Sequence, residues 1–127
     1  MRPFIREAKS TTPYVEINYN DGHIQLKGVS HPENVFTFYN PIFQAIKAMK
    51  HEPVQEVVVD FVLEYFNTSS ARCLFLILKE VKELGLSGKK LTINWHYEEE
   101  DEDMLETGED FQELIELPFV FVEIEES

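Results

Sequence analysis

The sequence predicts an α/β fold in which a mixed β-sheet of about five strands, opened by an N-terminal hairpin, carries three main helices. Two strand-like segments, residues 14–19 and 23–29, flank Asn20-Asp21-Gly22, which tolerates the positive φ angles of a tight hairpin turn. Downstream, apolar segments of strand length alternate with segments of helical periodicity, which is typical of crossovers between parallel strands. With 127 residues, the chain has the size of one compact domain, residues 1–127, that folds without a disulfide or metal.

The segment after the hairpin is expected to form a helix and a buried strand. Ser30-His31-Pro32-Glu33 has the Ser-x-x-Glu spacing of a helix capping box. Because Pro41 interrupts the helical pattern, a short helical piece is expected before a helix over about residues 41–50. Residues 57–63 are almost continuously apolar and β-branched, which is typical of a central strand buried on both faces.

The second half of the chain is expected to add two helices and two strands. Apolar side chains recur at helical spacing in the two helical segments, and they alternate with polar ones in the strand between them. The predicted segments are a turn at residues 65–69, a helix to about residue 84, a strand at 91–97, a helix after the acidic run of residues 98–103, and a strand at 119–124.

Acidic side chains outnumber basic ones by 24 to 11, which gives a formal net charge of −13. Such a surface repels phosphate backbones and anionic lipid headgroups, because nucleic-acid binding depends on Lys and Arg displacing counterions. Neither nucleic acid nor a membrane is therefore expected as a partner. A positively charged protein face is the better candidate, since complementary fields speed encounter.

The single cysteine and the first residues predict a cytoplasmic protein. Cys73 has no partner for an intrachain disulfide, and its place beside an apolar helical stripe is typical of a small buried hydrophobe. Residues 1–10 lack the apolar core of a secretory signal. No segment reaches the roughly 18 apolar residues that a membrane span requires.

The sequence offers little catalytic chemistry, so a non-enzymatic protein without cofactor or metal is expected. It has no glycine-rich phosphate loop, no Gly-x-Ser-x-Gly elbow and no His-x-x-x-His pair. The competing hypothesis is an enzyme that uses Asp60, His96 and the acidic loop for acid–base or metal chemistry. It requires a pocket in which these polar groups converge.

The acidic run of residues 98–103 has three interpretations. Asp101 and Asp103 begin the register of a calcium loop, but the apolar Met104 and Leu105 occupy the next positions and Gly108 comes too late. A docking surface for a basic partner is the second interpretation. The pattern favours the third, a solvated loop that places negative charge near a helix N-terminus, where the helix dipole stabilises it.

Hydroxyl side chains cluster after the predicted central strand, in Asn67-Thr68-Ser69-Ser70. One such residue suffices to cap the following helix, so four in succession exceed the requirement. The carboxyl end of a central strand is where ligands and partners approach, and a phosphate there gains from a helix N-terminus. The pattern alone favours a simple cap, with a regulatory phosphosite as the alternative.

The segments around this cluster resemble the SiaC family of bacterial regulatory phosphoproteins. The resemblance extends from the hairpin to the last strand and implies a STAS-like fold, similar to the anti-sigma-factor antagonists, which agrees with the predicted order of elements. The segments that carry it are Tyr65-Phe66-Asn67-Thr68-Ser69-Ser70-Ala71-Arg72, then Trp95-His96-Tyr97, Asp101-Glu102-Asp103-Met104 and Gly108-Glu109-Asp110-Phe111.

The resemblance implies a phosphorylation switch at Thr68. Family members are phosphorylated on the Thr of the Asn-Thr-Ser-Ser segment by a dedicated serine/threonine kinase, and a PP2C-type phosphatase removes the phosphate. The unphosphorylated form binds and activates a diguanylate cyclase, which connects the switch to cyclic-di-GMP and to biofilm or aggregation control. With the resemblance, a phosphosite at Thr68 is favoured over a simple cap.

The switch loop is expected to contact the partner, and phosphate on Thr68 is expected to disrupt that contact. Arg72, one helical turn along, either reaches the phosphate or forms an intrachain salt bridge. Two competing hypotheses are a partner switch of the anti-sigma-factor-antagonist type with another output, and a constitutive interaction domain without modification. The residues assigned to the switch loop beside Thr68 are Tyr65, Asn67, Ser69, Ser70 and Arg72.

Overall fold

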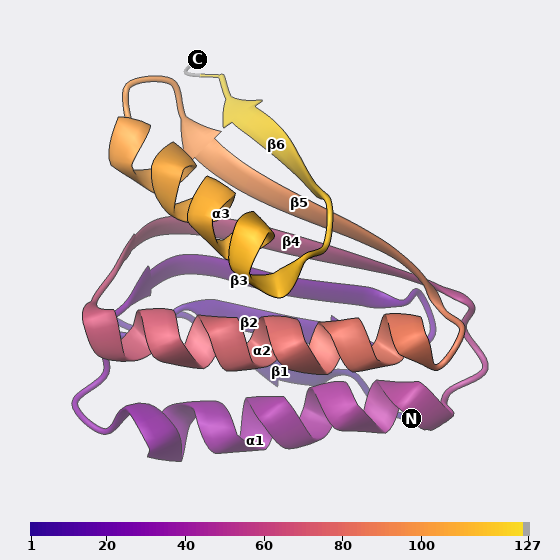
Figure 1. The fold of residues 1–127 in the computed structure, drawn as a ribbon. Helices are drawn as coiled ribbons and strands as arrows, with labels where there is room; N and C mark the ends of the chain where they lie inside the picture. The colour runs from indigo at the N-terminus through magenta and orange to yellow at the C-terminus, as the bar shows by residue number, and fades with distance from the viewer. Residues whose placement is uncertain (126–127) are drawn as a thin grey trace.

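The computed structural model describes residues 1–125 and shows a six-stranded sheet with three helices on one face (Figure 1). The predicted class is confirmed, with six strands in place of about five. The elements are β1 (Phe4–Arg6), β2 (Tyr14–Asn18), β3 (His23–Ser30), α1 (Val35–Ala48), the short 3-10 helix η1 (Met49–His51), β4 (Glu56–Phe66), α2 (Thr68–Leu86), β5 (Lys90–Glu98), α3 (Glu102–Ile115) and β6 (Phe119–Ile124).

The order of the strands in the sheet follows their order in the chain. β1, β2 and β3 pair antiparallel, and β3 to β6 pair parallel. One helix connects each parallel pair. Because successive crossovers share one hand and advance in one direction, all three helices lie on the same face. Within residues 1–125, no helix is long and apolar enough to cross a membrane.

Only one face of β4 is fully buried, so the predicted burial of this strand on both faces is wrong. Val57, Val59 and Phe61 point toward the helices and are at most 1% exposed. Val58 and Val62, on the opposite face, are only half-buried, because no helix covers that side. We call this side the open face of the sheet.

Helix α1 begins earlier than predicted and continues through Pro41. Its N-cap is Asn34, whose side chain accepts a first-turn hydrogen bond of 3.2 Å, so the predicted capping box at Ser30 is not formed. Ser30 ends β3 instead and is fully buried. Pro41 removes one backbone donor, and the helix continues because Tyr39 and Ile42, on either side of it, are fixed in the core.

Strand β4 continues to Phe66, so the predicted turn at residues 65–69 is wrong. The pairing of β3 with β4 contains a bulge, where the register shifts between Gly28 and Val29. One extra residue of β4 lies in the bulge, and the two strands pair again beyond it. Helix α2 follows after a single residue, Asn67. The residues assigned to the switch loop therefore lie at the end of a paired strand and at the start of a helix.

Trp95 joins the last strands to α3. Its ring stacks on Phe119 and meets Phe111 edge-on, and its Nε1–H donates to the carbonyl of Met104 at 2.9 Å. Gly108 lies against the indole, where a Cβ would come within 2.5 Å of the ring. Helix α3 therefore approaches β5 this closely only because residue 108 has no side chain.

This contact predicts that Gly108→Ala destabilises the fold. The added methyl group overlaps the indole of Trp95, so α3 must shift and its hydrogen bond to the ring weakens. The free energy of unfolding should fall by about 1–3 kcal/mol. Urea denaturation followed by the fluorescence of the single tryptophan measures it. Glu109→Ala, at the exposed neighbour, is the control and should change stability by less than about 0.5 kcal/mol; an equal loss in both variants would contradict the prediction.

Candidate switch site at the amino terminus of helix α2

The hydroxyl side chains at the start of α2 differ in their surroundings. Asn67 is the N-cap, and its Oδ1 accepts a hydrogen bond of 2.9 Å from the backbone N–H of Ser70. Thr68 and Ser69 are exposed in the first turn, whereas Ser70 is fully buried. Because Asn67 supplies the cap, the hydroxyl of Thr68 is available for modification without loss of the capping hydrogen bond.

A buried chain of hydroxyl groups fixes the first turn of α2 to β3 and α1. Ser30 donates to Ser70 Oγ at 2.7 Å, and the Tyr39 hydroxyl lies 2.6 Å from Ser30 Oγ. All three residues are fully buried, and burial raises the pKa of Tyr39 to about 12. The prediction that Ser70 contacts a partner is therefore corrected, because its side chain lies inside the protein and positions the turn.

Arg72 lies one turn after Thr68 on the exposed side of α2. The spacing of i, i+4 and i+7 places Thr68, Arg72 and Phe75 on one stripe of the helix. Among residues 1–125, the ion pairs within 4.0 Å do not involve Arg72. Of the two predicted roles, the intrachain salt bridge is not formed, and the guanidinium is available to a phosphate on Thr68.

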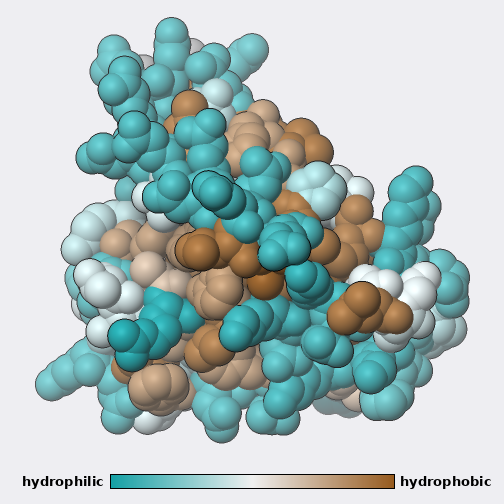
Figure 2. All heavy atoms as spheres, viewed as in Figure 1, coloured by the Kyte–Doolittle hydropathy of each residue, from teal (hydrophilic) through white to brown (hydrophobic). Residues whose placement is uncertain are grey.

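An apolar seam, made of Phe66, Phe75 and Phe111, lies between α2 and α3. The rings of Phe66 and Phe75 are half-buried and stack on Phe111, with centroids 6.4 and 6.5 Å from it. Figure 2 shows apolar side chains gathered across the middle of this face, with hydrophilic groups above and below them. The stripe that begins at Thr68 therefore borders an apolar surface.

Tyr65 and Phe66, at the end of β4, differ in their surroundings. Phe66 is half-buried and packs edge-on against Trp95. Tyr65 is 54% exposed, and its ring meets that of His31 edge-on at 5.8 Å. The carboxyl edge of the sheet thus presents an exposed aromatic ring close in sequence to Thr68.

A polar network lies on the open face. The Asp60 carboxylate accepts hydrogen bonds from His23 Nε2 at 2.7 Å and from His96 Nε2 at 2.8 Å, and Asn94 donates a third at 3.0 Å. Burial by itself raises the pKa of Asp60. The three hydrogen bonds outweigh burial, so the pKa falls below its ordinary value of 3.8. Sequence reasoning singled out Asp60 and His96 but missed His23, which only strand pairing brings to the carboxylate.

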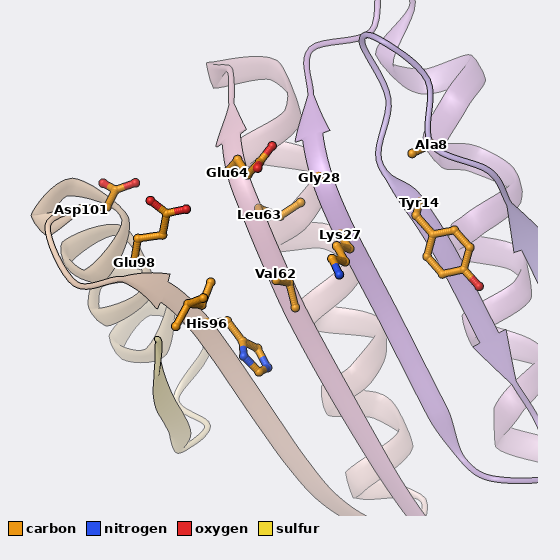
Figure 3. Close-up of a pocket in the computed structure, with 11 residues that line it drawn as sticks. Ala8, Tyr14, Lys27, Gly28, Val62, Leu63, Glu64, His96, Glu98 and Asp101 are labelled. Atoms are coloured by element: carbon orange, nitrogen blue, oxygen red, sulfur yellow. The ribbon is translucent and has the colours of Figure 1, made fainter. Parts of the chain in front are cut away.

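A groove of about 790 Å³ opens on this face near the carboxyl ends of β3, β4 and β5 (Figure 3). Lys27 and His96 line it, and Glu98 and Asp101 lie together on one side. The imidazole Nε2 of His96 is already bonded to Asp60. Within the described part of the chain, no three His, Cys, Asp or Glu residues are arranged to hold a metal ion.

The acidic run extends from the end of β5 to the first turn of α3, so its predicted position at a helix start is confirmed. Asp101 is the N-cap of α3 and accepts a hydrogen bond of 3.0 Å from the backbone N–H of Met104. Glu102 and Asp103 lie in the first turn, where the helix dipole stabilises negative charge.

Comparisons with known proteins agree with this fold. Residues 6–124 match the family model described as SiaC family regulatory phosphoprotein. SiaC of Pseudomonas aeruginosa, in its apo crystal structure, is 24% identical and superposes with a TM-score of 0.86 over 96% of this chain and 99% of that chain. A crystal structure of the Pseudomonas aeruginosa diguanylate cyclase SiaD with its activator SiaC matches with a TM-score of 0.88, 24% identity, and 95% and 99% coverage.

A curated relative, an uncharacterized protein of Pseudomonas aeruginosa strain UCBPP-PA14, is 27% identical over 109 residues, or 86% of each chain. The one-sided sheet defines a small α/β domain, and the matching family model describes a class of regulatory proteins. Because the family model covers residues 6–124, the chain belongs to the SiaC family. The resemblance drawn from the sequence is confirmed.

The network on the open face predicts that Asp60→Asn lowers the free energy of unfolding by about 1–3 kcal/mol at neutral pH, because three hydrogen bonds lose their charged acceptor. The lowered pKa of Asp60 means that its contribution is present above the ordinary value of 3.8 and is lost as the pH falls through the lower folded-state value. The difference between wild type and variant should therefore shrink between about pH 5 and about pH 2.

Chemical denaturation at several pH values measures this difference. Thr92→Ala, a half-buried substitution on the neighbouring strand, is the control and should give a pH-independent change. A change in Asp60→Asn that stays constant across the same range would contradict the charge-based account.

Proposed function

We propose that this chain is a non-enzymatic regulator switched by phosphorylation of Thr68. The observation that carries the proposal is the division of roles at the start of α2. Asn67 caps the helix and Ser70 anchors it, while Thr68 is exposed in the first turn. A serine/threonine kinase adds the phosphate and a PP2C-type phosphatase removes it, as the family resemblance implies.

A phosphate on Thr68 is stabilised locally without a change of fold. It adds roughly −1.5 to −2 charges at the N-terminus of α2, where the helix dipole favours an anion. Arg72, on the same stripe one turn later, supplies a charge-assisted hydrogen-bond partner. The modification therefore converts a neutral turn beside the apolar seam into an anionic one.

The unphosphorylated form is proposed to bind and activate a diguanylate cyclase, and so to control cyclic-di-GMP and biofilm or aggregation. SiaC of Pseudomonas aeruginosa is the activator of the cyclase SiaD, and this chain shares its fold. Here the proposed contact surface comprises Tyr65, Thr68, Ser69 and the half-buried rings of Phe66 and Phe75. A partner packed there would have to desolvate a phosphate on Thr68, which opposes binding.

Phosphosite mapping tests the modification. In protein purified from its native cells, intact-mass and peptide mass spectrometry should find phosphate on Thr68. Thr68→Ala should abolish the signal, and Ser69→Ala, at the equally exposed neighbour, should retain it. The proposal would be contradicted by phosphate on Ser69 in place of Thr68, or by no phosphate on either residue in growing, starved and surface-attached cells.

Binding to the cyclase encoded by the same organism tests the output. Thr68→Glu, which mimics the added charge, should weaken binding by roughly tens to hundreds of times and abolish cyclase activation. Thr68→Ala should change the affinity by less than about threefold. Titration calorimetry and the rate of cyclic-di-GMP synthesis provide the measurements. If the two variants bind the cyclase with equal affinity, Thr68 does not lie in the interface.

A further inference from the structure

Strand β6 is an edge strand with little protection against pairing. Within residues 1–125 its only neighbour in the sheet is β5, and Figure 1 shows it as the outermost strand. Exposed edges are normally short, charged or bulged. At the opposite edge, β1 is three residues long and carries the charged Arg6. Strand β6 is six residues long, and Glu123 is its single charged residue. Val120 is 52% exposed.

The backbone of β6 presents hydrogen-bonding groups on its outer side. The N–H of Phe119 donates to Gln112 Oε1 at 2.7 Å and not to β5. Because successive N–H groups of a strand point in opposite directions, those of Phe121 and Glu123 point away from β5 as well. Their donors and carbonyls are placed to receive another strand.

The negative charge of the protein is concentrated around this edge. Residues 1–97 contain ten acidic and eleven basic side chains and are almost neutral. Residues 98–127 contain fourteen acidic side chains and no Lys or Arg. This segment supplies α3 and β6, and Figure 2 shows hydrophilic side chains gathered at the upper left of the molecule, where α3 begins. An occupant of the edge therefore meets a strongly negative field.

We propose that the outer edge of β6 is a docking site for an extended, basic segment of a partner protein, which adds to the sheet as a seventh strand. Main-chain hydrogen bonds to Phe121 and Glu123 provide the pairing. Apolar side chains of the segment cover Val120 on the open face, and its Lys or Arg residues meet the carboxylates of the acidic segment.

Charge complementarity selects this occupant over a second copy of the chain. Two β6 edges placed side by side would bring two segments of fourteen acidic residues together, and like charges repel. The docking site is also separate from the switch. Thr68 comes after β4, and β5 lies between β4 and β6 in the sheet. The proposal therefore stands independently of phosphorylation.

The test uses a fluorescein-labelled peptide of about eight residues in which Lys and Val alternate, with binding measured by fluorescence anisotropy. Glu123→Pro removes the outward N–H and places a ring against the incoming strand, yet it leaves the bonds to β5 intact. Glu123→Gln removes the same charge and keeps the N–H. Circular dichroism and thermal unfolding establish that both variants are folded.

Glu123→Pro should weaken peptide binding by roughly tenfold or more, and Glu123→Gln by less than about threefold. A peptide of the same sequence that is N-methylated on alternate residues tests the same bonds without altering the protein. One of the two N-methylation registers should bind at least roughly tenfold more weakly than the parent peptide. An alternating Glu–Val peptide should not bind.

Two outcomes would overturn the proposal. If Glu123→Pro and both N-methylated peptides bind as tightly as their unmodified counterparts, the peptide is held by charge alone and no strand is added. If sedimentation shows a wild-type dimer that Glu123→Pro dissociates, the edge is occupied by a second copy of the chain and not by a basic partner.

Discussion

The shared hand of the three crossovers is the constraint on which the other features of this protein depend. It places all three helices on one face of the sheet and leaves the opposite face uncovered. The carboxyl ends of the parallel strands consequently meet at one edge, where α2 begins. The same arrangement leaves Asp60 on the open face and makes β6 an outermost strand. The switch turn, the polar network and the free edge are three consequences of a single topological choice.

At the start of α2, the residues that anchor the helix are neighbours of Thr68, the proposed phosphosite. The buried chain from Tyr39 through Ser30 to Ser70, together with the Asn67 cap, fixes the first turn of α2 to β3 and α1. Thr68 takes part in neither interaction. A phosphate there acts through charge and desolvation at a fixed surface, and it does not require the helix to refold.

The distribution of charge would give a phosphate on Thr68 a strong local effect. Because residues 1–97 are close to neutral, roughly two added negative charges at Thr68 change the character of their surface. The same two charges placed among the fourteen acidic residues of 98–127 would change the local charge only slightly. The chain therefore combines a nearly neutral region, which contains the proposed phosphosite, with an acidic region whose field favours basic segments.

The sequence by itself determined the order of the main elements, the hairpin at Asn20-Asp21-Gly22 and the family, because periodicity, turn residues and motifs are local. It missed β1, since three residues show no period. Only the tertiary structure decided which side chains are buried. Packing of α2 against the sheet places Ser70 inside, and the open face leaves Val58 half-buried. Strand pairing brings His23 to Asp60, and core packing carries α1 through Pro41. Each of these outcomes depends on contacts between residues far apart in the chain, and local sequence patterns do not predict such contacts.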